Sequence, residues 1–215
     1  MLLKAERKQV VEYSRKLLTS NLVKESGGNI SLSNPKKNMM AVTPSGVSYD
    51  ILEIEDVVIL DMSGHQLEGD LSPTSEIAFH LALQKLRPEI HAVVHTHSVH
   101  ATAVACLGWE LPPIHYLLGF AGKKVPLSPY STFGTEELSD NICSSIGESN
   151  AVLMANHGLV CVGSDLDKAF ITAEMVEYVA QLYLLTKSVG DPIVLTSQQM
   201  EPVMDKFRSY GQKKQ

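Results

Sequence analysis

The segment 92–97, Ala-Val-Val-His-Thr-His, contains two histidines whose spacing suits metal binding. Small and β-branched apolar residues lead into it, and Pro88 stops the preceding helical pattern, which predicts a short buried strand. Alternate side chains of a strand point to the same face, so His95 and His97 would present two imidazoles side by side, as a divalent metal site requires. The chain has eight histidines, however, so a chance His-x-His pair is the competing interpretation.

Two residues elsewhere in the chain could complete a metal site. Glu76 is expected in the first turn of the helix before the histidine strand, and His157 at a glycine-flanked turn after another buried strand. Three imidazoles and one carboxylate would suit Zn²⁺ better than Mg²⁺ or Ca²⁺. The simpler alternatives are a carboxylate placed to favour the start of a helix and an ordinary turn histidine. His80, one helical turn beyond Glu76, is also eligible. The remaining histidines are weaker candidates: His65, His91, His100 and His115.

Three turns rich in glycine and hydroxyl side chains could bind an anion such as phosphate. Each turn offers backbone N–H groups and side-chain donors, although such residues also dominate ordinary turns. One of them precedes the helix that begins near Glu76, where the helix dipole favours an anion. The six candidate residues are Gly28, Asn29, Ser45, Gly46, Thr74 and Ser75.

The elements that must position these residues alternate between strands and helices with short connections. Helical patterns cover about 4–23, 76–87, 98–107, 135–147 and 166–188, and a capping box at 196–199 predicts a last helix. Strands are expected at 30–32, 39–42, 57–62, 65–68, 92–97, 151–154 and 159–162. No linker or repeat interrupts this order, so we expect a single α/β domain over residues 1–215, with helices on both faces of a mixed sheet.

Composition narrows the possible partners and location. The net charge is −6 and the only notable basic pair is Lys213-Lys214, so nucleic acid is not an expected partner. No apolar run approaches the roughly 20 residues of a membrane-spanning helix, and the charged start has no signal-peptide core. Cys106, Cys143 and Cys161 are widely spaced among apolar neighbours, which indicates reduced core thiols in a cytoplasmic protein.

Seven short motifs make the chain resemble the class II aldolase/epimerase family from its first helix to Tyr210. They are Gly-Gly-Asn-Ile-Ser (27–31), Thr-Pro-Ser-Gly (43–46), Thr-Ser-Glu (74–76), His-Thr-His-Ser-Val-His (95–100), Ile-His-Tyr (114–116), Thr-Phe-Gly-Thr (132–135) and Asn-His-Gly (156–158). The resemblance implies a three-layer α/β/α domain with a central mixed, largely antiparallel sheet. It also implies a cyclic homotetramer with active sites between subunits.

The resemblance also implies the roles of individual residues. One Zn²⁺ per subunit would be bound by Glu76, His95, His97 and His157, and the six turn residues above would hold the substrate phosphate. His80, His100 and His115 would then be structural. Tyr116 would reach the site of a neighbouring subunit as a proton donor and acceptor. Three further aromatic residues match positions near the aldehyde end of the site: Phe133, Phe207 and Tyr210.

The reaction implied is the reversible cleavage of a ketose 1-phosphate to dihydroxyacetone phosphate and an aldehyde. The expected substrate is L-fuculose 1-phosphate, which would yield L-lactaldehyde. Zinc would stabilise the developing enediolate as a Lewis acid. Glu76 would leave the metal when substrate arrives and act as the base at the reacting carbon, while Tyr116 would exchange a proton with the hydroxyl that becomes the aldehyde oxygen.

Other activities in the same family are the alternatives. An L-ribulose-5-phosphate 4-epimerase would carry Asp at the position of Glu76 and an acidic residue in the loop after Tyr116, where this chain has Leu117-Leu118-Gly119. A further alternative is another pentulose-phosphate aldolase or a methylthioribulose-phosphate dehydratase. The presence of Tyr116 argues against the dehydratase. A non-catalytic interaction module like the adducin head has lost metal ligands that this chain keeps. A purely structural zinc site would usually contain cysteines.

Overall fold

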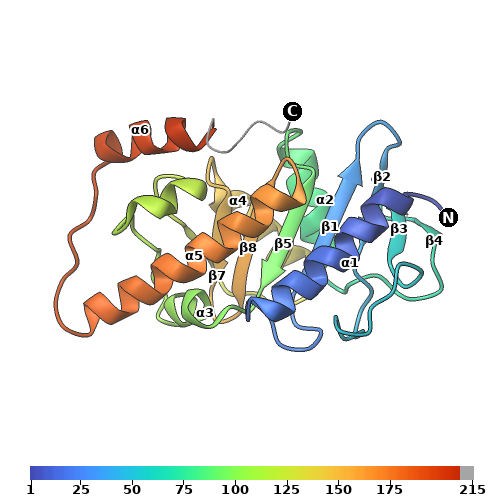
Figure 1. Cartoon of the computed structure of the whole chain (residues 1–215), viewed down its shortest axis with the longest axis horizontal. Coiled ribbons are helices and arrows are strands. Elements are labelled where there is room, and N and C mark those ends of the chain that lie inside the picture. The colour runs from blue at the N-terminus through green and yellow to red at the C-terminus, as the bar shows by residue number, and fades with distance from the viewer. Residues whose placement is uncertain (209–215) are drawn as a thin grey trace.

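The chain folds around one eight-stranded sheet, as the computed structural model of residues 1–208 shows (Figure 1). The strand order is β4-β3-β2-β1-β5-β8-β7-β6, and every neighbouring pair is antiparallel except β6 and β7. The strands are β1 (Asn29–Asn34), β2 (Met39–Val42), β3 (Val58–Asp61), β4 (Gln66–Glu68), β5 (Ala92–Thr96), β6 (Leu127–Ser128), β7 (Ala151–Met154) and β8 (Gly158–Gly163). The expected mixed, largely antiparallel sheet is therefore confirmed.

Helices cover both faces of this sheet and make the three layers that the resemblance implied. The α-helices are α1 (Lys4–Thr19), α2 (Ile77–Leu86), α3 (Val99–Cys106), α4 (Glu136–Ile146), α5 (Leu166–Lys187) and α6 (Ser197–Arg208), and a 3₁₀ helix, η1, spans Tyr116–Phe120. In Figure 1, α1, α3 and α5 lie in front of the sheet, while α2 and α4 lie behind it. None of the helices in this part of the chain is both long and apolar enough to cross a membrane.

The alternation of side chains along β5 divides the core between the two layers. Ala92 and Val94 pack into the larger cluster with α1, α3 and α5, whereas Val93 packs with Phe79 of α2 and with apolar residues of α4. Since His95 and His97 are two and four residues after Val93, their side chains lie on the same face as Val93 and point toward the α2 layer. The strand thus directs both imidazoles to the side on which Glu76 lies.

Several local expectations were wrong. The first helix ends at Thr19 instead of Val23, and a 3₁₀ helix follows His115, where no element had been assigned. Cys161 is buried as a core thiol, but Cys106 is exposed at the end of α3 and Cys143 is half-buried. Apolar neighbours in sequence did not distinguish a helix end from its buried face. The role expected for Tyr210, near the aldehyde end of the site, and the basic pair Lys213-Lys214 concern residues outside the described chain.

Candidate metal centre

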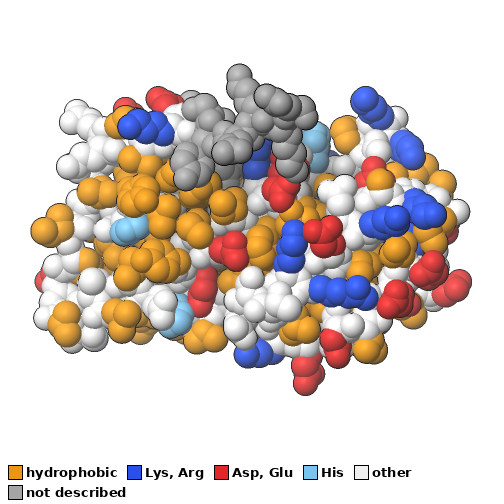
Figure 2. Space-filling model, in the orientation of Figure 1, with side chains coloured by type: hydrophobic (Ala, Val, Ile, Leu, Met, Phe, Trp, Pro, Cys, Tyr) orange, Lys and Arg blue, Asp and Glu red, His pale blue; other side chains and the backbone are white. Residues whose placement is uncertain are grey.

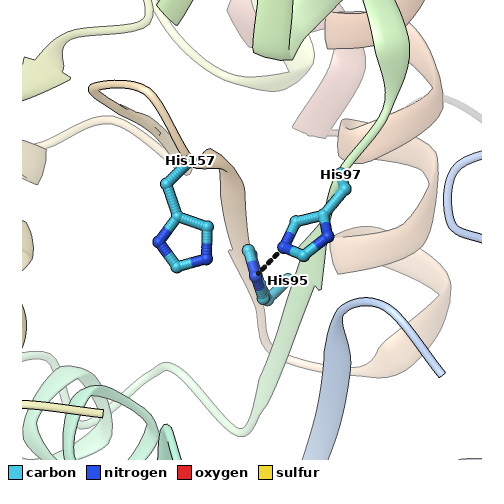
Figure 3. Close-up of side chains that lie close together, drawn as sticks. All are labelled: His95, His97 and His157. Carbon is cyan, nitrogen blue, oxygen red and sulfur yellow. Dashed lines mark hydrogen bonds between the residues drawn. The ribbon is translucent and has the colours of Figure 1, made fainter. Parts of the chain in front are cut away.

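Three histidine rings, carried by the end of β5 and by the turn before β8, converge on one point (Figure 3). His95 lies in β5, His97 follows its last residue, and His157 lies in the turn between β7 and β8. One ring nitrogen from each lies within 4.8 Å of the others, and the Nε2 atoms of His95 and His97 are 3.0 Å apart. Imidazole nitrogens at this spacing can bind a single metal ion.

The turn that carries His157 is shaped by its two neighbours. Asn156 adopts a left-handed conformation with φ of 55°, which asparagine tolerates better than most residues. Gly158 lies so close to β5 that a Cβ atom there would be 2.4 Å from the carbonyl oxygen of Thr96. A glycine is therefore needed for β8 to approach β5 closely enough to bring His157 to the other two rings.

Glu76 adds a carboxylate to this cluster. It is the N-cap residue of α2, not a member of the first turn as expected, and its side chain caps no backbone N–H. Its Oε2 atom accepts a hydrogen bond of 2.8 Å from Asn29 Nδ2 and lies 3.4 Å from His95 Nε2. Its Oε1 atom lies 3.5 Å from His157 Nε2 and, although buried, has no hydrogen-bond partner within residues 1–208.

Burial keeps two of the histidines, His95 and His97, in the neutral form that can bind a metal. The pKa of His95 is held well below its usual value by burial and by the adjacent His97 and His157, and the pKa of His97 is lowered by burial and by His157. His95 Nδ1 is 3.0 Å from the carbonyl oxygen of Leu159 and donates to it, which leaves the Nε2 lone pair facing the cluster.

The donor set fits a divalent metal. Burial raises the pKa of Glu76, opposed by the Asn29 hydrogen bond and by His157, and a buried carboxylate oxygen without a partner is unfavourable on its own. A cation at the convergence point would satisfy this oxygen together with three imidazole lone pairs. Three nitrogens and one oxygen suit Zn²⁺ in particular.

The six turn residues expected to bind phosphate line the same cavity as the metal cluster. This cavity has a volume of about 400 Å³ and is also lined by Glu76, His97 and His157. The residues come from three segments that are distant in sequence: Gly28 and Asn29 at the start of β1, Ser45 and Gly46 after β2, and Thr74 and Ser75 before α2. Two of the six already contact Glu76: the Asn29 side chain donates to its carboxylate, and the Thr74 hydroxyl accepts from its backbone N–H at 3.3 Å.

Other expected site residues are placed differently. Phe133 lines the cavity and is 65% exposed, and the neighbouring Tyr130, which the sequence did not single out, lines it too. Tyr116 is not among the lining residues of its own chain. Its ring is half exposed beside His115, at a centroid distance of 4.8 Å, and beside Phe207, at 6.2 Å.

His80 does not join the three converging rings. Both of its nitrogens are engaged elsewhere, at 2.6 Å from Asn29 Oδ1 and 2.8 Å from Ser31 Oγ. The sequence offered it as an alternative ligand because it lies one turn beyond Glu76, but that spacing could not show which way the ring turns. His100 is likewise occupied, by Glu177 at 2.7 Å.

Comparison with known proteins gives the same family throughout. The family model described as class II aldolase and adducin N-terminal domain matches residues 8–184. The chain is 45% identical to a 5-deoxy-D-ribulose 1-phosphate aldolase of Bacillus thuringiensis serovar kurstaki, over 99% of this chain and 100% of that protein. It is 38% identical to the L-fuculose phosphate aldolase of Escherichia coli K12, over 95% and 94%. A solved structure of an L-fuculose 1-phosphate aldolase superposes with a TM-score of 0.93 at 38% identity, covering 95% of this chain and 96% of that chain.

Proposed function

The chain belongs to the class II aldolase and adducin N-terminal domain family and is an enzyme of the class II aldolase type, and from this premise we propose that it cleaves a ketose 1-phosphate reversibly to dihydroxyacetone phosphate and an aldehyde. The observation that carries the proposal is one cavity in which a buried carboxylate with an unpartnered oxygen faces three imidazoles beside three donor-rich turns. The proposed metal ligands Glu76, His97 and His157 and the proposed phosphate-binding turns thus line the same cavity.

In this proposal Zn²⁺ is held by His95, His97, His157 and Glu76. When bound, it supplies Lewis-acid stabilisation for the negative charge that develops on the substrate oxygens as the carbon–carbon bond breaks. Burial lowers the pKa values of His95 and His97, so these two rings remain neutral. They therefore keep their lone pairs available at neutral pH.

Glu76 is the proposed proton carrier at the reacting carbon. Its Oε2 accepts a hydrogen bond from Asn29, so Oε1 is the oxygen proposed to exchange the proton once the carboxylate has left the metal. Burial raises the pKa of this carboxyl, which makes it a stronger base than an exposed glutamate. In cleavage it would return a proton to the enediolate carbon, and in synthesis it would remove that proton.

The phosphate is proposed to lie against Thr74 and Ser75, with the turns at Gly28 and Ser45-Gly46 closing around it. Thr74 and Ser75 precede the N-terminus of α2, where the helix dipole favours an anion. An anchored phosphate fixes the distance from the reacting carbon to Glu76, which lowers the entropic part of the barrier.

We propose 5-deoxy-D-ribulose 1-phosphate as the preferred substrate, with L-fuculose 1-phosphate, the substrate expected from the motifs, as the second candidate. The first is supported by 45% identity over the full length of a relative that carries its name, and the second by 38% identity and the structural match. Both would yield dihydroxyacetone phosphate. Their aldehydes differ by one hydroxylated carbon, acetaldehyde in the first case and lactaldehyde in the second.

A cyclic homotetramer is part of the proposal because Tyr116 lies outside the cavity of its own chain. Figure 2 shows an apolar patch over the region that α5, α3 and η1 occupy in Figure 1. Exposed apolar side chains of these elements and the α3–η1 connection are Val99, Leu107, Trp109, Tyr116, Tyr178 and Leu185. A patch of this kind is typical of a protein interface, across which Tyr116 could enter a neighbour's cavity as the acid at the aldehyde oxygen.

The test is to measure bound metal and the release of dihydroxyacetone phosphate from a panel of ketose phosphates. We expect about one zinc per chain and turnover of both 1-phosphates, with a higher kcat/KM for the 5-deoxypentulose. Glu76→Gln should remain folded and lose turnover by at least about 100-fold. The proposal would be refuted if the zinc-loaded protein cleaved none of the ketose 1-phosphates, or if Glu76→Gln kept wild-type turnover.

A further inference from the structure

A chain of buried hydrogen bonds runs from the second turn of α2 through β1 to Glu76. Gln84 Nε2 is 3.3 Å from Ser31 Oγ, and Ser31 Oγ is 2.8 Å from His80 Nδ1. His80 Nε2 is 2.6 Å from Asn29 Oδ1, and Asn29 Nδ2 is 2.8 Å from Glu76 Oε2. All five side chains are less than 10% exposed, and His80 is fully buried. Water is therefore not available to replace these bonds.

The donors of this chain all point toward Glu76. The Asn29 oxygen can only accept, so His80 Nε2 must carry the proton of that bond. Burial lowers the pKa of His80 to about 3, so the ring is neutral and its Nδ1 accepts from the hydroxyl of Ser31. Gln84 then donates to the Ser31 oxygen. The direction of each hydrogen bond is thus determined by its partners, and the last bond is the one that the Asn29 amide donates to the Glu76 carboxylate.

We propose that His80 is a positioning residue that fixes the orientation of the Asn29 amide and, through it, the carboxylate of Glu76. The proposal builds on the function proposed above. If the Asn29 amide turned by 180°, its oxygen would face Oε2 and the two acceptors would repel each other. His80 prevents this turn because only the amide oxygen can accept from Nε2–H. Glu76 is thereby held with Oε2 bonded and Oε1 free to face His157.

The His80 ring is itself held rigidly. It stacks on Phe79 with a centroid distance of 4.5 Å and an angle of 20° between the ring planes. Asn29 and Ser31, its two partners, lie two residues apart on β1 and so face the same side of the sheet. A ring fixed by stacking and by bonds at both nitrogens can impose direction on a flexible amide, which a water molecule in its place would not do.

The first test determines which nitrogen of His80 carries the proton and does not depend on enzyme activity. Two-dimensional ¹H–¹⁵N spectra of the metal-free protein should show His80 as the neutral Nε2–H form at pH 6 to 8. An Nδ1–H form, or a charged ring in that range, would overturn the proposal because the donors would then point away from Glu76. An inactive wild-type protein would refute the proposed function but would leave this measurement valid.

The second test compares variants by zinc affinity and steady-state kinetics. His80→Leu removes the donor, and we expect a loss of roughly 10- to 100-fold in zinc affinity or in kcat, the range found when groups that support metal ligands are removed. KM should change less than threefold if the phosphate turns are intact, an order-of-magnitude limit. In His80→Gln the side-chain NH₂ can reach Asn29 Oδ1, so most of the loss should be recovered.

Leu83→Ala is the matched control for a purely structural effect. Leu83 is fully buried in the same helix, but it packs in the apolar cluster and takes no part in the chain. It should lower thermal stability without changing zinc affinity or kcat. If His80→Leu has wild-type zinc affinity and kcat, or if His80→Gln recovers nothing, His80 does not position Glu76. If His80→Leu does not fold, the proposal is tested by the zinc affinity and kcat of His80→Gln and by the spectra of the wild-type protein.

Discussion

Acidification of the metal-free protein should reveal that His80 is held neutral in the folded chain. Burial lowers the pKa of His80 from 6.5 to about 3. The unfolded chain therefore takes up a proton near pH 6.5 that the folded chain does not bind until far lower pH. The stability due to this histidine is complete above pH 6.5 and is lost progressively as the pH falls from that value to about 3.

The size of the loss follows from the difference in bound protons. One histidine contributes about 1.4 kcal/mol per pH unit between its folded and unfolded pKa values. Between pH 7.5 and pH 5.0 His80 should thus remove about 2 kcal/mol from the free energy of unfolding, from a typical total of about 5–15 kcal/mol. His95 acts in the same direction, whereas Glu76, whose pKa burial raises, acts in the opposite one. The contribution of His80 is therefore better obtained by comparing the pH dependence of unfolding free energy in wild type and a His80 variant than from the pH dependence of wild type alone.

The assay is urea unfolding of chelator-treated wild type and His80→Gln at both pH values. The variant should lose about 2 kcal/mol less than wild type on acidification, because glutamine does not titrate. His65→Gln serves as the control, since the His65 side chain is 82% exposed and keeps its hydration on folding. Equal losses in wild type and His80→Gln would refute the neutral buried imidazole and the direction of the hydrogen bonds derived from it.

Three further comparisons test other parts of the site. His157→Ala should lower the zinc content after gel filtration, because it removes one of the three nitrogens within 4.8 Å of one another. Tyr116→Phe should keep its zinc but release dihydroxyacetone phosphate about 100-fold more slowly, and an unchanged rate would exclude proton transfer by this hydroxyl. Gly28→Ala should destabilise the fold more than Gly46→Ala in urea melts. Both have positive φ, at 83° and 72°, but only at Gly28 would a Cβ meet backbone, 2.4 Å from the His95 carbonyl oxygen.

The sequence predicted most elements because apolar periodicity depends on which residues face the core. The strand at 92–97 is an example, since the alternation that identified it also placed both histidines on one face. Helix ends were less predictable. Glu76 was expected inside the helix, yet it is the N-cap residue, which leaves its side chain free to turn toward the histidines. Local propensity does not distinguish these two positions, although they direct the carboxylate differently.

The contacts within the site depend on strand register, which the sequence pattern leaves open. Asn29 lies directly opposite His95 in the β1–β5 pair, and Thr96 lies opposite Leu159 in the β5–β8 pair. A slip of two residues would keep every apolar side chain on its own face, so burial alone cannot exclude it. It would, however, bring Ser31 opposite His95 and remove the amide from Glu76. The close approaches at Gly28 and Gly158 do exclude it, because any other residue at those points would contact the β5 backbone. The two glycines thus fix the register that brings a carboxylate, an amide and three imidazoles together.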